Sequence, residues 1–382
     1  MTGRRKFLML AGGGIVLAAA GGGVWAATRD PAKARRPWGD AGKDESDPRR
    51  RALSYALLAP NPHNRQPWLA DLRTAGEVTL YCDADRHLPH TDPFDRQITI
   101  GLGAFIELLT MAAAEDGYRA DLQLFPEGEP QPALDGRPVA RVRFFEDAAV
   151  PADPLFAFVL ARRSNKEAYD PERAVPGKIL VEIAGAARTG RVAHTNEPAE
   201  VEKLRALAWA AMETELNTPR TLKESVDLMR IGRAEIEANP DGISLSGPLI
   251  EGLALTGLLS REAMLDPNSA MFEQQLATLK PQFETAMAFL WLTTPGNSRA
   301  DQIAAGRDYV RLNLAATSAG VSMQPFSQAL QEYPEMRPHY LATRNMLGIA
   351  ETETLQMFVR LGYGPDIPAA PRWPLDTRIK SA

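Results

Sequence analysis

The chain has 382 residues, of which 45% are hydrophobic and 24% charged, an ordinary composition for a globular protein of one or two domains. Its formal net charge of −5 and pI near 5.7 give no support for a nucleic-acid partner. A single cysteine, Cys82, excludes an internal disulfide, and the five histidines form no Cys/His cluster with zinc spacing, so we expect no metal site.

Residues 1–27 have the features of an export signal. Gly3-Arg4-Arg5-Lys6-Phe7-Leu8 is followed by an apolar run, rich in glycine and alanine, that ends in small residues near Ala26. The paired arginines resemble the twin-arginine signal, so we expect export by the twin-arginine translocase to a periplasmic or membrane-associated location. An uncleaved membrane anchor is the alternative, disfavoured because the run is short and glycine-rich. The twin-arginine route exports folded proteins, often with a cofactor already inserted.

Residues 28–48 separate this signal from the first expected helix. The stretch is rich in Arg, Lys, Asp, Gly and Pro and lacks apolar periodicity. Segments of this composition bury too little apolar surface to fold. A flexible linker is therefore expected, with ordered structure beginning near Arg49.

Residues 49–150 are expected to alternate helices and strands. Periodicity predicts helices over Arg49–Leu58 and Phe94–Asp116, and strands over Glu77–Cys82, Asp121–Phe125 and Arg141–Phe145. Asp135-Gly136 is the expected turn between the last two strands. Gly101-Leu102-Gly103 lacks the third glycine and the strand-to-helix context of a dinucleotide fingerprint, so it predicts close helix packing instead.

A proline-rich segment, Ala59–Trp68, lies between the first helix and the first strand. Proline fixes φ and removes a backbone donor, so this proline corner (residues 59–68) is expected to be rigid and non-helical. It would hold Asn64, Gln66 and Trp68 in fixed relative positions. A well-made turn with no further role is the plain alternative.

Residues 151–382 are expected to be richer in helix. Helices are predicted over Pro154–Ala161, Lys178–Ala187, Arg299–Ala319 and Met336–Leu347, and strands over Arg191–His194 and Gln356–Gly364. Glu200–Leu292 is predicted to be mostly helical, with a break at residues 239–242.

Three separated stretches together resemble the FMN-dependent nitroreductase family. They are Ala59-Pro60 with Asn64-x-Gln66-Pro67-Trp68, then Arg162-x-Ser164-x-Lys166, and last Gln324-Pro325, Gln356-Met357, Arg360-Leu361-Gly362-Tyr363-Gly364 and Pro371-Arg372. Each motif alone is weak, but together they follow the family order across most of residues 49–372. The resemblance implies an α+β, nitroreductase-like fold with mostly antiparallel sheets flanked by long helices, and FMN as the cofactor.

The resemblance also implies roles for the basic residues. Arg162 and Arg372 would bind the FMN phosphate, because a guanidinium fork suits a phosphate, and Ser164 would hydrogen-bond nearby. Lys166 would lie at the N1/C2 carbonyl edge of the ring, where positive charge stabilises the reduced flavin. Taken without the resemblance, residues 162–166 would be a solvated charged loop.

The proline corner would supply the remaining polar contacts to the cofactor. By resemblance, Asn64 and Gln66 would contact the ring or the ribityl chain. The other residues expected at the cofactor are Pro67, Trp68, Arg163, Gln324, Pro325, Ser327 and Arg360. No side-chain acid or base is required in the family, so the catalytic residues stay unassigned.

The order of the motifs points to two halves in one chain. In a classical subunit of the family the R-x-S-x-R motif precedes the Asn-x-Gln-Pro-Trp loop, whereas here it follows. Each half has kept the piece that the other has lost, which resembles the Acg-like branch, in which a single chain mimics the family dimer. The resemblance implies halves at 49–150 and 151–382 with one flavin site between them, and a monomer. A helical insertion at about 212–292 is the lid candidate, bending over the flavin near residues 239–244.

Two functions remain open from the sequence. One is an FMN oxidoreductase that takes hydride from an unknown electron donor and passes it to a nitro compound, a quinone or a similar small-molecule acceptor. The other is a flavin-sequestering or storage protein without turnover, favoured by export, because nicotinamide donors stay in the cytoplasm. A degenerate relative without flavin is a third outcome.

Overall fold

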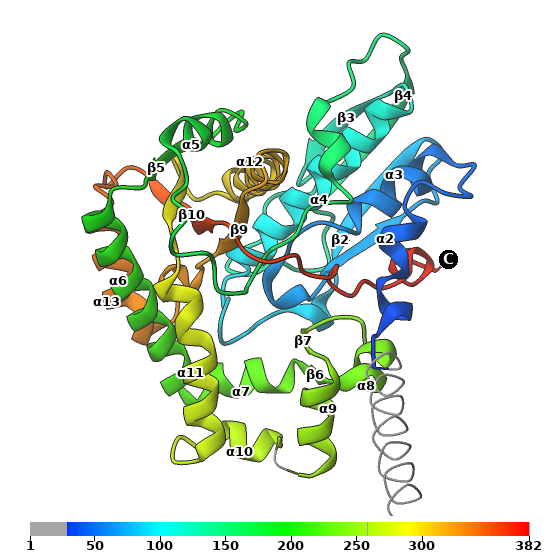
Figure 1. Cartoon of the computed structure of the whole chain (residues 1–382). Helices are drawn as coiled ribbons and strands as arrows, with labels where there is room; N and C mark the ends of the chain where they lie inside the picture. Colours follow the sequence, from blue (N-terminus) through cyan, green and yellow to red (C-terminus); the bar gives the residue numbers. More distant parts are fainter. Residues whose placement is uncertain (1–28, 258, 382) are drawn as a thin grey trace, which may run out of the picture.

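Two four-stranded antiparallel sheets and two long central helices form the body of the protein (Figure 1). The computed structural model describes residues 29–257 and 259–381, so the expected export signal lies outside the described residues. The first sheet has the order β1 (Trp68–Asp71), β2 (Glu77–Cys82), β4 (Ala140–Glu146), β3 (Tyr118–Leu124). The second has the order β5 (Arg191–Thr195), β8 (Ala288–Thr294), β10 (Thr354–Gly362), β9 (Ser322–Pro325).

The two sheets belong to units with the same succession of elements. In the first unit, α3 (Pro48–Ala56) precedes β1 and β2, and α4 (Arg96–Glu115) lies between β2 and β3. In the second, α5 (Gly177–Ala184) precedes β5, and α12 (Arg299–Ser318) lies between β8 and β9. Numbered within its unit, each sheet has the strand order 1-2-4-3. The mixed helix and antiparallel-sheet architecture expected from the sequence is therefore present, as two units in one chain.

The helices α4 and α12 pack directly on each other at the centre. A Cβ atom on Gly306 would lie 2.9 Å from the Cα atom of Gly103, and one on Gly103 would lie 3.0 Å from the Cα atom of Gly306. Neither glycine can therefore carry a side chain without moving the helices apart. Helix α4 is long and apolar enough to cross a membrane, but it is mostly buried in this core.

A buried arginine begins each of these helices and reaches into the opposite unit. Arg96 donates to the carbonyl oxygens of Leu330 (2.6 Å) and Gln356 (3.1 Å). Arg299 donates to the carbonyl oxygens of Phe94 (2.8 Å) and Pro132 (2.7 Å). Each glycine of the crossing follows its arginine by seven positions, Arg96 before Gly103 and Arg299 before Gly306. The two units are thus joined by reciprocal contacts.

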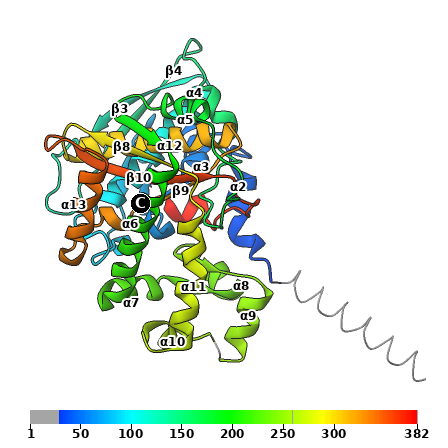
Figure 2. The ribbon, with the colours of Figure 1, turned by 60° about the vertical axis from the view of Figure 1, so that its left-hand side comes forward.

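The second unit carries a long insertion between β5 and β8. It comprises α6 (Pro198–Asn217), α7 (Pro219–Asp227), β6 (Met229–Ile231), α8 (Gly232–Ala238), β7 (Ile243–Leu245), α9 (Pro248–Leu255), α10 (Arg261–Leu265) and α11 (Ala270–Glu284). Figures 1 and 2 both show α7 to α10 as a separate tier below the sheets. This tier has its own small hydrophobic core, which includes Leu222, Val226 and Phe272.

Three expectations from the sequence are corrected here. The helical insertion was expected to reach Leu292, but Ala288–Thr294 is β8, the strand that pairs with both β5 and β10. A short apolar run buried on both faces gives the same pattern as a buried helix segment. The helix expected over Pro154–Ala161 is only the 3₁₀ turn Pro154–Phe158. Asp135-Gly136 is part of a longer connection between β3 and β4.

The expected flexible linker is the fourth correction. Ordered structure begins well before Arg49, with the 3₁₀ helix Ala32–Arg35 and α2 (Arg36–Asp40). Trp38 is 7% exposed and packs with the first unit. One buried aromatic ring therefore orders a segment that its composition alone predicted to be mobile.

The C-terminal tail returns from the second unit to the first. After β10, the chain contacts α2 and ends beside β1, where the Lys380 amide donates to the Ala70 carbonyl oxygen at 2.8 Å. The other elements after α12 are the 3₁₀ turns Gln328–Leu330, Pro334–Met336 and Leu375–Arg378, and α13 (Arg337–Met346). The tail brings Arg372 to the proline corner, although the two are far apart in sequence.

Candidate functional site

The proline corner has a strained backbone. It forms one 3₁₀ turn, Pro62–Asn64, and three non-glycine residues have left-handed φ angles: His63 (46°), Asn64 (51°) and Gln66 (52°). Such angles are uncommon outside glycine and persist only where surrounding contacts enforce them. One such contact is the hydrogen bond from the Gln66 amide to the Asn61 side-chain oxygen, at 2.7 Å. Strain of this kind clusters at functional sites.

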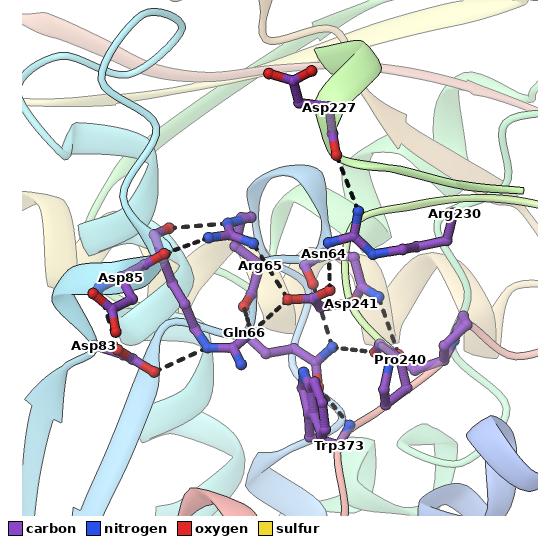
Figure 3. A network of polar contacts seen from close by, with 12 residues as sticks. Asn64, Arg65, Gln66, Asp83, Asp85, Asp227, Arg230, Pro240, Asp241 and Trp373 are labelled. Atoms are coloured by element: carbon purple, nitrogen blue, oxygen red, sulfur yellow. Dashed lines mark hydrogen bonds and ion pairs between the residues drawn. The ribbon is translucent and has the colours of Figure 1, made fainter. Parts of the chain in front are cut away.

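The amide side chains of the corner bind other segments of the chain. Asn64 accepts from Arg372 (2.6 Å) and donates to the Pro371 carbonyl oxygen (3.1 Å). Gln66 is fully buried, accepts from the Trp373 amide (2.9 Å) and donates to the Pro240 carbonyl oxygen (2.7 Å), as Figure 3 shows. Gln66 therefore ties the corner to the tail and to the insertion, and its expected contact with the cofactor stays a prediction.

Arg162, Arg163 and Arg372 form a basic cluster beside the corner. Arg162 donates to the Leu58 carbonyl oxygen (2.8 Å) and to the side-chain oxygen of Asn313 (3.0 Å). Besides Asn64, Arg372 donates to the carbonyl oxygens of residues 57 and 59 at 2.8 and 3.0 Å. Arg163 also donates only to carbonyl oxygens. Within the described part of the chain, none of the three guanidinium groups has a carboxylate partner.

This uncompensated charge is buried. Arg162 and Arg372 are 2% and 3% exposed. Burial, together with neighbouring guanidinium groups, lowers the pKa of Arg162 to about 10 and holds the pKa of Arg372 well below its usual range. The buried Nε atom of Arg162 has no hydrogen-bond partner among the described residues. The Tyr309 hydroxyl is buried close to Arg162 and Ser164. A bound anion would satisfy both the charge and the unpartnered donor of Arg162.

Lys166, in the basic loop (residues 162–166), lies close enough to His63 of the corner for its charge to act on the imidazole. Lys166 keeps solvent contact, yet the surrounding protein lowers the pKa of its ammonium group by desolvation. Desolvation, followed by the charges of Lys166 and Arg65, lowers the pKa of His63 to about 4. His63 is therefore neutral at pH 7, and its Nδ1 atom has no hydrogen-bond partner within the residues that the structure describes. The basic loop and the corner are close to each other, whereas the shared cleft expected between them stays a prediction.

Trp68 and Pro67 lie in the core of the first unit. The Trp68 side chain is fully buried, with its ring centroid 5.0 Å from that of Phe105. The Pro67 carbonyl oxygen accepts from the Asp83 amide at 2.8 Å. Both residues therefore anchor the corner to the first unit.

The residues of the C-terminal motifs that were expected at the cofactor contact the basic loop and belong to, or lie beside, the second sheet. Arg360 is fully buried and donates to the Gln324 side chain (2.7 Å) and the Glu167 carbonyl oxygen (2.6 Å). Burial lowers its pKa to about 10. Pro325 pairs with β10, and the Ser327 carbonyl oxygen accepts from Gln97 at 3.4 Å. Ser164 lies in the same loop, partly exposed.

The insertion is clamped to the corner through Asp241. This buried carboxylate accepts from Arg65 (3.3 Å), Arg86 (2.7 Å) and Arg230 (3.0 Å). The neighbouring Gly242 amide donates to the Asn64 carbonyl oxygen at 3.3 Å. Figure 3 shows Asp241 between the guanidinium groups, next to Pro240. The break expected at residues 239–242 is thus the point where the insertion meets the corner.

Four residues of the site were missed from the sequence. Tyr309 and Asn313 lie one turn apart on α12, so their spacing could have marked a shared polar face. His63 stands inside the corner itself. Trp38 was a lone aromatic residue in a charged stretch, and that contrast was the available signal.

Sequence comparison finds relatives from Mycobacterium tuberculosis. One, named "Putative NAD(P)H nitroreductase acg", is 26% identical over 361 residues, which covers 85% of this chain and 93% of the relative. A second protein with the same type of name is 24% identical over 329 residues and covers 85% and 88%. No protein-family model matches the chain. The similarity to proteins named as nitroreductases extends over most of both chains.

Solved structures of FMN proteins show a weaker likeness. The FMN-dependent nitroreductase NfnB from Mycobacterium smegmatis, solved with NADPH, is 22% identical, covers 58% of this chain and 95% of its own, and has a TM-score of 0.36. A nitroreductase from Bacteroides fragilis with bound FMN is 16% identical, covers 56% and 90%, and has a TM-score of 0.33. Likeness at these TM-scores does not place individual side chains, so the site rests on its own contacts.

Proposed function

We propose that this protein is a single-chain member of the nitroreductase family that binds FMN and acts as an oxidoreductase toward nitro compounds, quinones or similar acceptors. The observation that carries the proposal is the cluster of Arg162, Arg163 and Arg372 beside the proline corner. Two of its guanidinium groups are buried, and none has a carboxylate partner in the part of the chain that the structure describes. Similarity to named NAD(P)H nitroreductases along most of the chain supports it.

The residues present fit an FMN molecule. A phosphate dianion would offset the charge of Arg162 and Arg372 and accept from the unpartnered Nε atom of Arg162. Lys166, whose charge acts on His63 of the corner, would supply the positive charge that stabilises a reduced flavin. Bound FMN would supply hydride transfer from a nicotinamide donor to the acceptor. The chain itself would position the cofactor, set its electrostatics and, through the insertion, exclude water.

The visible spectrum of the purified protein tests this proposal. We expect flavin absorbance that bleaches when NADPH is added without oxygen and returns when a nitrofuran or quinone is added. Protein that carries no flavin, and gains none from added FMN, would contradict the proposal.

A flavin-sequestering protein is the second candidate function. The clamp of Asp241 on Arg65, Arg86 and Arg230 favours it, because this contact ties the insertion to the corner of the site. Photoreduction followed by rapid mixing with a quinone separates the two candidates. Fast reoxidation of the flavin supports the enzyme, and a flavin inert to acceptors supports storage.

Export and the fused-dimer origin are further parts of the proposal. The two units with the same strand order support a chain that mimics a dimer. The Arg4-Arg5 pair supports export by the twin-arginine translocase to the periplasm or the membrane. Replacing both arginines by lysine should retain the protein in the cytoplasm, as cell fractionation would report; unchanged export would contradict this route.

A further inference from the structure

The segment of residues 29–41, here called the N-terminal strap, is docked on the basic cluster. Trp38 donates from its indole nitrogen to the Ala370 carbonyl oxygen at 2.8 Å. The Arg372 amide donates to the Ala34 carbonyl oxygen, also at 2.8 Å. Ala34, Trp38 and Ala41 are all buried. The strap therefore folds against the same tail that delivers Arg372 to the proline corner, as the adjacent α2 and tail in Figure 1 show.

The indole ring of Trp38 lies against all three guanidinium groups of the cluster. Its ring centroid is 4.9 Å from the Arg163 guanidinium carbon, 5.4 Å from that of Arg372 and 5.7 Å from that of Arg162. Cation–π contacts of this kind contribute far less than the cost of burying several unpaired charges. The ring covers the cluster without neutralising it.

The other end of the strap reaches the insertion. Arg29 pairs with Glu251 of α9 at 3.1 Å, and Glu251 also accepts from the Arg233 amide at 2.9 Å. The Glu251 carboxylate is buried. The strap thus spans from the basic cluster to the helical tier that carries Asp241.

We propose that Trp38 forms the outer wall of the anion site of Arg162, Arg163 and Arg372, and that the strap must undock before a phosphate-bearing ligand enters or leaves. The inference rests on the proposed function, since FMN is the phosphate monoester concerned. It assigns a binding role to residues within the segment that its composition predicted to be a flexible linker.

The test compares Trp38→Ala with Trp38→Phe in the full-length protein, each loaded with FMN or with riboflavin, which lacks the phosphate. Ligand release is followed by flavin fluorescence after dilution. We expect Trp38→Ala to release FMN about tenfold faster than the wild type, because about 1.4 kcal/mol of ring contact is lost, and Trp38→Phe to stay close to it. Riboflavin release should change little in either variant. Equal acceleration for both flavins, or no acceleration for FMN, would overturn the inference.

A probe without flavin separates this inference from the proposed function. Inorganic phosphate should raise the melting temperature of the wild type more than that of Trp38→Ala or Arg162→Ala. If the protein binds no flavin but shows this pattern of phosphate stabilisation, the flavin function is rejected and the role of the strap at the anion site is supported. Should Trp38→Ala not fold, Glu251→Gln removes the ion pair at the other end of the strap. We expect this variant to release FMN faster while phosphate still stabilises it as much as the wild type. Unchanged FMN release would overturn the inference.

Discussion

Among the described residues, Arg162, Arg372 and Glu215 are buried without an opposite charge beside them. The arginines donate only to neutral oxygens, and Glu215 accepts from the Gln331 side chain at 2.9 Å. Burial lowers the pKa of both arginines and raises the pKa of Glu215 to about 7. An unpaired buried charge costs stability unless a ligand or a proton compensates it. The two arginines therefore predict ligand binding at the basic cluster, and Glu215 predicts that the stability of the protein depends on pH.

Arg162→Ala should weaken FMN retention by about 1.5–3 kcal/mol, the contribution of a hydrogen bond to a charged group. Equilibrium dialysis against FMN measures the change. Arg137→Ala is the matched control, because Arg137 pairs with Asp135 on the surface. Undiminished flavin occupancy in the Arg162 variant would count against the phosphate assignment.

Glu215→Gln should change how stability depends on pH. With a pKa near 7 in the folded state and near 4.5 unfolded, Glu215 binds a proton in the folded protein across this window, so wild-type stability falls as pH rises through it. The variant should match the wild type near pH 4 and exceed its free energy of unfolding by roughly 1–3 kcal/mol near pH 8. Urea unfolding across this range measures the difference, and the exposed Glu202→Gln is the control. A difference that does not grow with pH would contradict the assignment.

At the scale of elements, two contacts hold the site together: the crossing of α4 with α12, and the docking of the turn at residues 239–242 on the proline corner. The first joins the two units through facing glycines. The second joins the insertion to the corner through one carboxylate and three guanidinium groups. The first contact depends on the absence of side chains at the facing glycines, and the second depends on opposite charges. Different substitutions therefore test them separately.

Asp241→Asn should loosen the insertion without removing the corner. It takes away the charge that offsets three arginines, and breaking a buried ion pair costs roughly 3–5 kcal/mol. We expect faster hydrogen exchange at residues 239–244 and easier quenching of bound flavin by iodide. Asp227→Asn is the control, since its carboxylate pairs only with Lys223 at the surface and its carbonyl oxygen still accepts from Arg230. Unchanged exchange in Asp241→Asn would rule out the clamp.

Gly306→Ala should destabilise the whole protein, because the new methyl group would meet the backbone of α4. Overpacking of this kind costs about 1–3 kcal/mol or more. Gly252→Ala, on α9 with open space around it, should instead be neutral or slightly stabilising. Thermal unfolding compares the two, and equal melting temperatures would show that the crossing tolerates a side chain.

At the scale of the whole molecule, one chain supplies both sides of the site. The proline corner comes from the first unit, the basic loop from the second, and the tail returns to join them. The reciprocal contacts of Arg96 and Arg299 bury the surface between the units. Nothing in the site as described needs a second copy.

We therefore expect the purified protein to behave as a monomer. Sedimentation across a range of micromolar concentrations should give the mass of a single chain, at most 41.7 kDa. Twice that mass at all concentrations would contradict the expectation.

The sequence determined the elements with strong periodicity and the segments that meet at the site. Helices α4 and α12 and strand β2 follow from apolar spacing and β-prone residues, which are local properties. The proline corner is rigid because its prolines restrict the backbone wherever the chain places them. The basic loop and Arg372 were singled out by their resemblance to motifs of the nitroreductase family, and a guanidinium fork suits the phosphate that the resemblance implies.

Only the tertiary structure decided which partners these groups meet within the chain. Gln66 and Arg360 donate to distant carbonyl oxygens and Trp68 packs on Phe105. Trp38 and Tyr309 reach the basic cluster from segments with no marked motif. Burial and hydrogen-bond partners depend on contacts between residues far apart in sequence, and β8 shows that such contacts also choose strand over helix. A local sequence pattern therefore determines which hydrogen bonds a side chain can make and how much apolar surface it can bury. The tertiary structure determines which other residues it contacts.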